Sequence, residues 1–472
     1  MRGHFSDVRT RFFAAHAGNK FSVSIDSGTN SGVRTLNLTM RVACTSRILG
    51  AMRIEVQSAD QLVLFVTDAL KEPLSNMQVV GFISDNAANV RSACATLAAN
   101  MNAQVFSCAC HAINKVVEKV AYTWEAVELG RTACDKARVQ RPTLIPQEIM
   151  SRWNPAYEAC EAVIKHAHLL AYENILEVSD VAKVEVAKKC IDTLYFESRR
   201  CESDTATIFD AAVAFSLAFN GKIAADIAFP EIFARNCYHE SLVCACLLSP
   251  AGTPEAFIPP IRRMVIHAMR TCLATIDCDF SERRFDAEMS IVMDGGLQRI
   301  FRIKKYGERP SIREFWGCGE TPLVFQLVEQ LLELPASSAN VERSFSEHAR
   351  CHTTDRTMMS EDSVNVQLGL HSFLKPTSQA KPNNTIPEPR DVDNVLSWCF
   401  FGWTSDRVKL LKEGESVTVF FTDPRTLKQT GYRGKLLSQD GAMWRVKWIS
   451  DKENRQRFNP LLDPWLLTAE MP

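Results

Sequence analysis

Strand and helix patterns alternate along the first part of the chain. Segments 20–25 and 34–42 alternate apolar and polar positions, so each predicts a strand with one buried face. Segment 78–84 holds a continuous apolar run, which is typical of a strand buried on both faces. Ser58 and Gln61 form a capping box, so a helix is expected to begin there. With shorter strand and helix signals that follow, this order predicts an α/β sheet with mixed strand directions.

Strand signals fade after residue 130, and helical ones replace them. Segments 181–193 and 206–219 are rich in alanine and repeat apolar residues with the period of a helix. Further helices are predicted over 323–333, 338–350 and 360–374, followed by a proline-rich stretch. The expected organisation is the first part of an α/β core at 1–130, an all-helical insertion at 131–320, the end of the core at 321–374, a linker at 375–409 and a small β-barrel at 410–472.

The C-terminal part carries its own strand pattern. Trp444, Val446 and Trp448 fall on one face of a strand, whereas Arg445 and Lys447 fall on the other. An Asp-Gly pair just before this run is a hairpin signal. The pattern predicts a small barrel of the SH3-like or Tudor-like kind.

Charge in this part is unevenly distributed. Between residues 425 and 457 there are nine Lys and Arg but three Asp and Glu. Arg445 and Lys447 are therefore candidate contacts to DNA phosphates, although a basic strand face is also common as a plain solvated surface. A Tudor-like barrel would instead bind a methylated amine, as on chromatin, through an aromatic cage. Tyr432 and Phe420 are the candidates for that cage.

Composition places the chain among ordinary globular proteins. It has 472 residues, 46% hydrophobic and 23% charged, which excludes collagen-like, coiled-coil and wholly disordered chains. The net charge of −1 means that any basic surface is local. No run of 18 apolar residues and no signal-like N-terminus is found, so we expect no membrane segment and an intracellular location. The 16 cysteines are then expected to be reduced thiols.

Two aspartates follow predicted strands. Asp26 ends the first strand and Asp85 ends the apolar one, where sheet-edge loops often form sites. If these strands are neighbours, both carboxylates meet at one edge, and Glu342 near the start of a later helix is the candidate for a third. Clustered carboxylates suit Mg²⁺ or Mn²⁺, and two such ions can drive phosphodiester chemistry. A strand-end aspartate is also common as a turn or cap residue, so spacing alone leaves both interpretations open.

Four longer motifs carry a family resemblance. They are Asp85-Asn-Ala-Ala-Asn89, Cys108-Ala-Cys-His-Ala-Ile-Asn114, Ser151-Arg-Trp-Asn154 and Leu334-Pro-Ala-Ser-Ser-Ala-Asn-Val-Glu-Arg-Ser-Phe-Ser346. In this order they resemble the hAT superfamily of transposases, and the last is similar to that family's C-terminal dimerisation motif. Ile25-Asp-Ser27 resembles the DUF659 segment found on the N-terminal side of many members.

The resemblance implies an RNase H-like fold, a mixed sheet interrupted by the all-helical insertion. It assigns Asp26, Asp85 and Glu342 to the acidic positions that hold Mg²⁺ or Mn²⁺ for DNA strand cleavage and transfer. Cys108 and His111 match a Cys-x-x-His feature beside the scissile phosphate.

The resemblance also assigns Arg152 and Trp153 to a DNA contact, with the tryptophan stacking on a flipped-out base. Packing between insertion and sheet is an equal alternative for Trp153. Cys108, Cys110 and His111 could instead belong to a zinc site, and a buried structural cysteine is at least as common. No second pair of ligands follows these residues at the spacing of a zinc finger, so we expect no structural zinc.

The sequence is compatible with two functions. The first is a nuclear hAT transposase-like protein that cleaves DNA with an Asp-Asp-Glu site and forms a homodimer or higher oligomer through 321–374. The BED-type zinc finger of many members is not found ahead of the first strand. Its absence favours the second function, a catalytically inactive, domesticated or truncated derivative that dimerises on DNA or chromatin.

Overall fold

The computed structural model describes residues 2–30, 33–43, 45–53, 58–85, 87–119, 125–146, 154–219, 239–249, 259–276, 281–293, 311–317, 319–351, 361–374, 411–422, 429–440, 443–449, 457–458 and 465–467. Strands and helices are mixed over these residues, so the α/β class is confirmed. No helix among them is both long and apolar enough to cross a membrane.

A five-stranded sheet with the order β3-β2-β1-β4-β5 forms the N-terminal core. Its strands are β1 (Lys20–Asn30), β2 (Val33–Val42), β3 (Thr45–Arg53), β4 (Gln78–Ser84) and β5 (Gln104–Ser107). Neighbours are antiparallel from β3 to β1, whereas β4 and β5 continue the sheet parallel to β1. The mixed strand directions expected from the sequence are confirmed, and β3 is an additional strand that the alternation does not predict.

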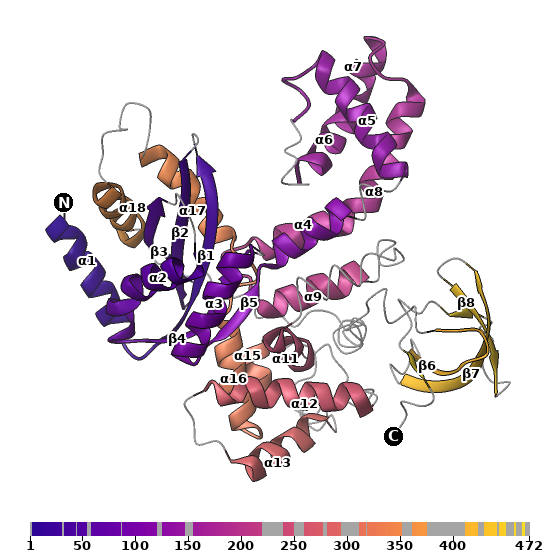
Figure 1. Cartoon of the computed structure of the whole chain (residues 1–472). Helices are drawn as coiled ribbons and strands as arrows, with labels where there is room; N and C mark the ends of the chain where they lie inside the picture. Colours follow the sequence, from indigo (N-terminus) through magenta and orange to yellow (C-terminus); the bar gives the residue numbers. More distant parts are fainter. Residues whose placement is uncertain are drawn as a thin grey trace.

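Three helices bury the apolar face of this sheet (Figure 1). They are α1 (Arg2–Ala15), α2 (Ala59–Leu74) and α3 (Ala88–Met101). The predicted capping box of Ser58 and Gln61 begins α2. The sheet residues packed against these helices include Phe21, Val23, Ile25, Leu36, Leu38 and Met40.

The polar face of β1 is buried as well. Ser22, Ser24 and Asp26 point away from the apolar face, yet each is at most 4% exposed. Helix α17 (Ala339–Cys351) packs on this face, and just before it the Ser22 hydroxyl donates to the carbonyl of Glu333 over 2.7 Å. Alternation predicts a half-exposed strand, which is wrong for β1, because a segment 300 residues away covers its polar side.

The free edge of β3 is covered by helix α18 (Glu361–Leu374). The side-chain amide of Asn365 donates to the carbonyl of Ala51 over 2.9 Å and accepts from its backbone N–H over 2.8 Å. The backbone N–H of Ile48 donates to the hydroxyl of Ser372 over 2.8 Å. Side chains of α18 thus occupy backbone groups that a further strand would use.

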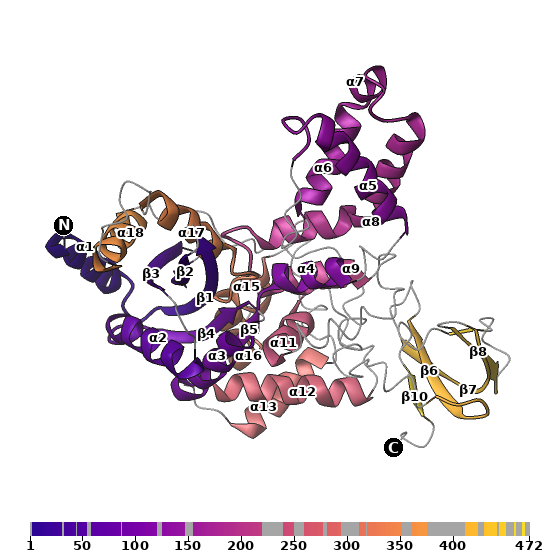
Figure 2. The same cartoon turned by 45° about the horizontal axis from the view of Figure 1, so that its top comes forward.

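A helical lobe extends away from the sheet in both views of the fold (Figures 1 and 2). It consists of α5 (Glu125–Gln140), α6 (Asn154–Lys165), α7 (Ala167–Tyr172) and α8 (Val178–Cys201). Its small core includes Cys134, Cys160, Val163, Leu170 and Val184. Helix α8 also packs on α4 (Ala109–Lys119), so it joins the lobe to the core.

Six further helices enclose a second core on the other side of β4 and β5. They are α9 (Ile208–Phe219), α11 (Glu240–Leu248), α12 (Pro259–Ala274), α13 (Glu282–Met293), α15 (Ile312–Trp316) and α16 (Pro322–Leu332). Residues 241–248 are all at most 2% exposed, so α11 is the centre of this core. The described residues between 131 and 320 form helices and no strand, while the domain limits stay a prediction.

The C-terminal part is an antiparallel sheet with the order β10-β6-β7-β8-β9. Its strands are β6 (Ser416–Thr422), β7 (Gln429–Asp440), β8 (Met443–Trp448), β9 (Arg457–Phe458) and β10 (Trp465–Leu467). Trp444 and Val446 are buried while Arg445 and Lys447 are exposed, as predicted, and Trp448 on the apolar face is half-buried. Among the described residues β9 and β10 do not pair, so a closed barrel stays a prediction, and the linker at 375–409 lies outside them.

Candidate active site

Three side chains from distant parts of the chain meet beside the polar face of β1. Asp26 lies in β1, His111 in the first turn of α4, and Glu342 in the first turn of α17. One possible ligand atom of each lies within 4.8 Å of the other two. Nδ1 of His111 is 4.0 Å from Oε1 of Glu342. Asp26 and Glu342 are thus brought together, although Asp26 lies within β1 rather than at its end.

Asp85 occupies the neighbouring position at the end of β4. Strands β1 and β4 pair in parallel up to Ile25 opposite Ser84, so Asp26 and Asp85 come next at the same edge. Oδ1 of Asp85 accepts the backbone N–H of Ala87 over 3.3 Å, just before α3. Asp85 acts on Asp26 electrostatically, but the group whose ligand atoms converge consists of Asp26, His111 and Glu342.

The segment 334–338 fixes α4 and α17 side by side. The backbone N–H of Ala109, at the start of α4, donates to the carbonyl of Ala336 over 3.0 Å. The backbone N–H of Ser338, just before α17, donates to Sγ of Cys108 over 3.3 Å. The start of α4 is hydrogen-bonded to this segment, and α17 follows directly after it. The first turns of the two helices therefore face each other, which places His111 next to Glu342.

Burial dominates the electrostatics of Asp26. Only 4% of the residue is exposed, and this desolvation raises its pKa well above the usual range. The charge of His111 lowers that pKa in part, whereas Asp85 and Glu342 raise it further. Two carboxylates in such a place favour a cation between them.

His111 supplies that positive charge. Burial lowers the pKa of its imidazole, but the Cys108 sulfur, Asp26 and Glu342 outweigh burial and raise the pKa to about 10. These three neighbours therefore favour the protonated form of the ring. Its Nδ1 is buried and has no hydrogen-bond partner in the part of the chain that the structure describes. A divalent cation can take over the neutralising role, with the deprotonated ring as a nitrogen ligand.

The two cysteines at the start of α4 have different surroundings. Burial raises the pKa of the Cys108 thiol, but hydrogen bonds from Cys110, His111 and Ser338, with the His111 charge, lower it below the usual value. Sγ of Cys110 also lies 3.5 Å from the carbonyl oxygen of Ser198 in α8. Neither cysteine belongs to the group that could hold a metal ion. The absence of structural zinc stays a prediction.

Four further residues were predicted to contact DNA, and the structure describes two of them. Arg152 and Trp153 are outside the described residues. Arg445 and Lys447 are exposed on β8, and Lys447 faces the exposed Lys435 directly across the strand pair. Like charges in that arrangement cost stability. Their contact with DNA stays a prediction.

The fold and the converging side chains thus define a mixed α/β protein with a candidate metal site on the polar face of β1. Residues 311–374 match the hAT family C-terminal dimerisation region. The match spans α15 to α18, includes Glu342, and supports both a relationship to the hAT family and the formation of a dimer. No curated protein matches the chain.

Proposed function

We propose that the chain is a hAT transposase-like protein whose Asp26, His111 and Glu342 serve metal-dependent DNA strand cleavage and transfer. The observation that carries the proposal is the convergence of these side chains within 4.8 Å of one another. Glu342 contributes from inside the segment that matches the dimerisation region. The mixed sheet, with helices placed between β5 and Glu342, supports an RNase H-like core interrupted by an insertion.

The donor set fits a divalent cation. Carboxylate oxygens of Asp26 and Glu342 suit Mg²⁺ and Mn²⁺, and the imidazole of His111 adds a nitrogen that suits Mn²⁺ better. The buried position of Asp26 beside the carboxylates of Asp85 and Glu342 also favours a cation there. When bound, such an ion activates an attacking oxygen and stabilises a leaving one.

The protein groups have separate tasks in this proposal. The backbone N–H of Ser27 donates to Oδ1 of Asp26 over 2.7 Å, which fixes that carboxylate. The neutral His111 ring keeps one N–H when its other nitrogen holds the ion, and this N–H is able to donate to a phosphate oxygen of the DNA. Asp85 adds negative potential beside Asp26 and orders the start of α3.

The test is nicking of supercoiled plasmid DNA by the full chain with Mg²⁺ or Mn²⁺. Asp26→Asn and Glu342→Gln are expected to lose nicking because each removes a charged ligand. Asp68→Asn is the matched control, since Asp68 is exposed on α2 and pairs with Lys71 alone among the described residues. Nicking by Asp26→Asn at the rate of the unmodified chain would overturn the proposal.

Dimer formation is proposed to use the surface of 311–374. Much of the apolar content of this region is already used inside the chain, because Leu331, Leu334, Val341, Val364 and Leu368 are all buried. The pairing surface must therefore be formed by the partly exposed side chains between them. A chain that ends at residue 390 is expected to self-associate like the full chain in light scattering. A monomer at micromolar concentration would contradict this.

The exposed basic face of β7 and β8 favours the second candidate, a non-catalytic protein associated with DNA or chromatin. Arg433, Lys435, Arg445 and Lys447 are all exposed there. Self-association and DNA binding without any metal-dependent nicking would assign this function instead. Location in the nucleus is part of both proposals.

A further inference from the structure

The helical lobe returns to the core through residues 201–208, and this return segment runs along the start of α17. The backbone N–H of Ala336 donates to the carbonyl of Ala206 over 3.3 Å. The backbone N–H of Ile208 donates to the carbonyl of Leu334 over 2.9 Å. The return segment and the segment that leads into α17 therefore pair like two short antiparallel strands.

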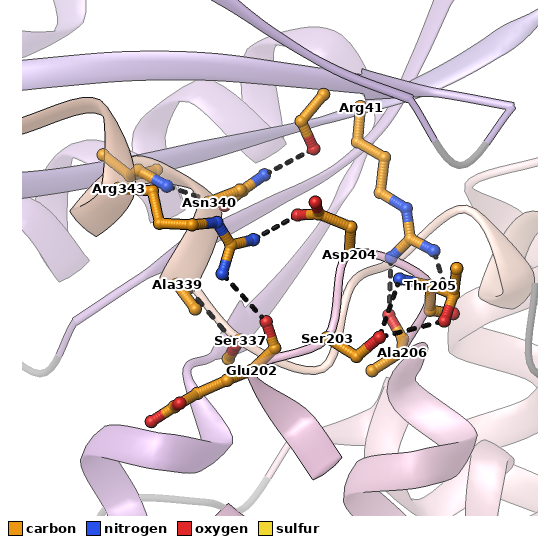
Figure 3. A network of polar contacts seen from close by, with 12 residues as sticks. Arg41, Glu202, Ser203, Asp204, Thr205, Ala206, Ser337, Ala339, Asn340 and Arg343 are labelled. Carbon is orange, nitrogen blue, oxygen red and sulfur yellow. Dashed lines mark hydrogen bonds and ion pairs between the residues drawn. The ribbon is translucent and has the colours of Figure 1, made fainter. Parts of the chain in front are cut away.

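An arginine of the sheet holds the return segment from one side (Figure 3). Arg41 of β2 is 1% exposed, and its Nη1 donates to the carbonyl of Ala206 over 2.6 Å. Its Nη2 donates to the carbonyl of Thr205 over 3.4 Å. The hydroxyls of Ser203 and Thr205 are hydrogen-bonded at 3.0 Å, which orders the turn itself. The return segment is thus fixed to the core and is not a loose linker.

A second arginine holds the same segment from α17 (Figure 3). Nη1 of Arg343 donates to the carbonyl of Glu202 over 3.0 Å, and its Nη2 pairs with the carboxylate of Asp204. Arg343 directly follows Glu342. On the same helix, Asn340 instead bonds the hydroxyl of Ser46 in β3 over 3.0 Å. Helix α17 is therefore anchored on one side to the sheet and on another to the end of α8.

We propose that Arg343 is a positioning residue that fixes the rotation of α17, and with it the Glu342 carboxylate, against the end of the helical lobe. Adjacent helix residues are about 100° apart around the axis, so a rotation that moves one moves the other equally. The inference rests on the proposed metal site of Asp26, His111 and Glu342. It means that the contact of Arg343 with the return segment sets the affinity of that site for its cation.

The direction in which the cation affinity changes when Arg343 is replaced distinguishes a positioning role from a purely electrostatic one. Arg343 is a cation near a cation site, so its charge alone opposes metal binding, and its removal would tighten binding. A positioning role predicts the opposite, because Glu342 then loses its place beside Asp26. The ion pair of an exposed arginine is expected to change the affinity for the cation by about fivefold at most.

The test is a titration of the full chain with Mn²⁺, followed by the electron paramagnetic resonance signal of the free ion. Arg343→Gln is expected to weaken Mn²⁺ binding by up to about fivefold. Arg343→Lys should restore part of it, because lysine keeps the charge and reaches one of the two acceptors. Arg141→Gln is the matched control: Arg141 is similarly exposed, pairs with Glu173 inside the lobe, and should bind Mn²⁺ like the unmodified chain.

The outcomes distinguish the two proposals. Binding that is lost in Glu342→Gln but unchanged or tighter in Arg343→Gln overturns the positioning role and leaves the metal site standing. Mn²⁺ binding that Glu342→Gln does not affect removes the metal site and the positioning role together. Weakening in Arg343→Gln with an unchanged thermal unfolding midpoint supports the inference.

Discussion

Strands β1 and β8 carry the same alternation of apolar and polar residues, but their polar faces have opposite surroundings. In β1, Ser22, Ser24 and Asp26 lie under α17 and are at most 4% exposed. In β8, Arg445 and Lys447 are exposed. Alternation therefore tells which residues share a face, but distant sequence decides whether that face meets water. Electrostatic interactions are stronger on a polar face that is shielded from water, as a catalytic site requires. On an exposed polar face, water weakens the same interactions.

The largest expected difference comes from placing a charge on each surface. Ser24→Lys should cost about 4 kcal/mol of unfolding free energy or more, because an unpaired ammonium would be buried under α17. Ser438→Lys, on the exposed side of β7, should change it by about 1 kcal/mol or less, which includes the like charge of Arg445 directly opposite. Denaturant unfolding of both variants measures this. Equal costs would mean that α17 does not seal the polar face of β1.

A smaller effect should appear in the acid sensitivity of the core. Burial, with the charge of Arg91, lowers the pKa of His239 to about 3, and its ring packs edge-on against Phe106 at 4.5 Å. The unfolded chain takes up a proton near pH 6.5, so stability is present above that pH and is lost as pH falls toward 3. Between pH 7 and pH 5 the loss is about 2 kcal/mol.

His239→Leu should remove this part of the pH dependence. The measurement is the unfolding free energy at pH 7 and at pH 5 for both chains. A loss in the variant as large as in the unmodified chain would show that His239 is not the group responsible.

The smallest effect concerns the exposed basic face. Lys447→Thr should raise the stability of the C-terminal sheet by a few tenths of a kcal/mol, because it removes the like charge opposite Lys435. The same change should reduce the number of counterions released on DNA binding by about one, which lowers the slope of the binding constant against salt concentration. Lys412→Thr is the control, since Lys412 is exposed but outside β7 and β8. An unchanged salt dependence for Lys447→Thr would remove β8 from the DNA surface.

Most of the predicted strands could be recognised from the residue pattern within the strand itself. β1, β2 and β4 follow from residue patterns within each strand, and α2 from its capping box. β3 could not be predicted, since the buried Arg47 and the half-buried Gly50 interrupt its alternation, and its register with β2 shifts at Leu38. α1 was missed because its sequence has little apolar periodicity, and its buried Phe13 packs on Phe373 from the far end of the core.

The candidate site was only partly predictable for the same reason. Asp26 and Glu342 could be proposed from motifs at the first strand and at the Ser-Ser-Ala-Asn-Val-Glu run. The place of His111 between them depends on hydrogen bonds from segment 334–338 to the start of α4, which no local pattern reveals. Its spacing from Cys108 was the only signal, and it did not identify the imidazole as a ligand beside the carboxylates.

The contacts of α18 on β3 also restrict how two copies of the chain can meet. An open sheet edge is a template for pairing with another chain, in dimers and in aggregates alike. Asn365 already occupies both backbone groups of Ala51, in the manner of a residue on a neighbouring strand. A second copy cannot extend the sheet at this point without first displacing α18. A dimer through the matched region is therefore expected to join helix to helix, and the same contact blocks extension of the sheet at the β3 edge.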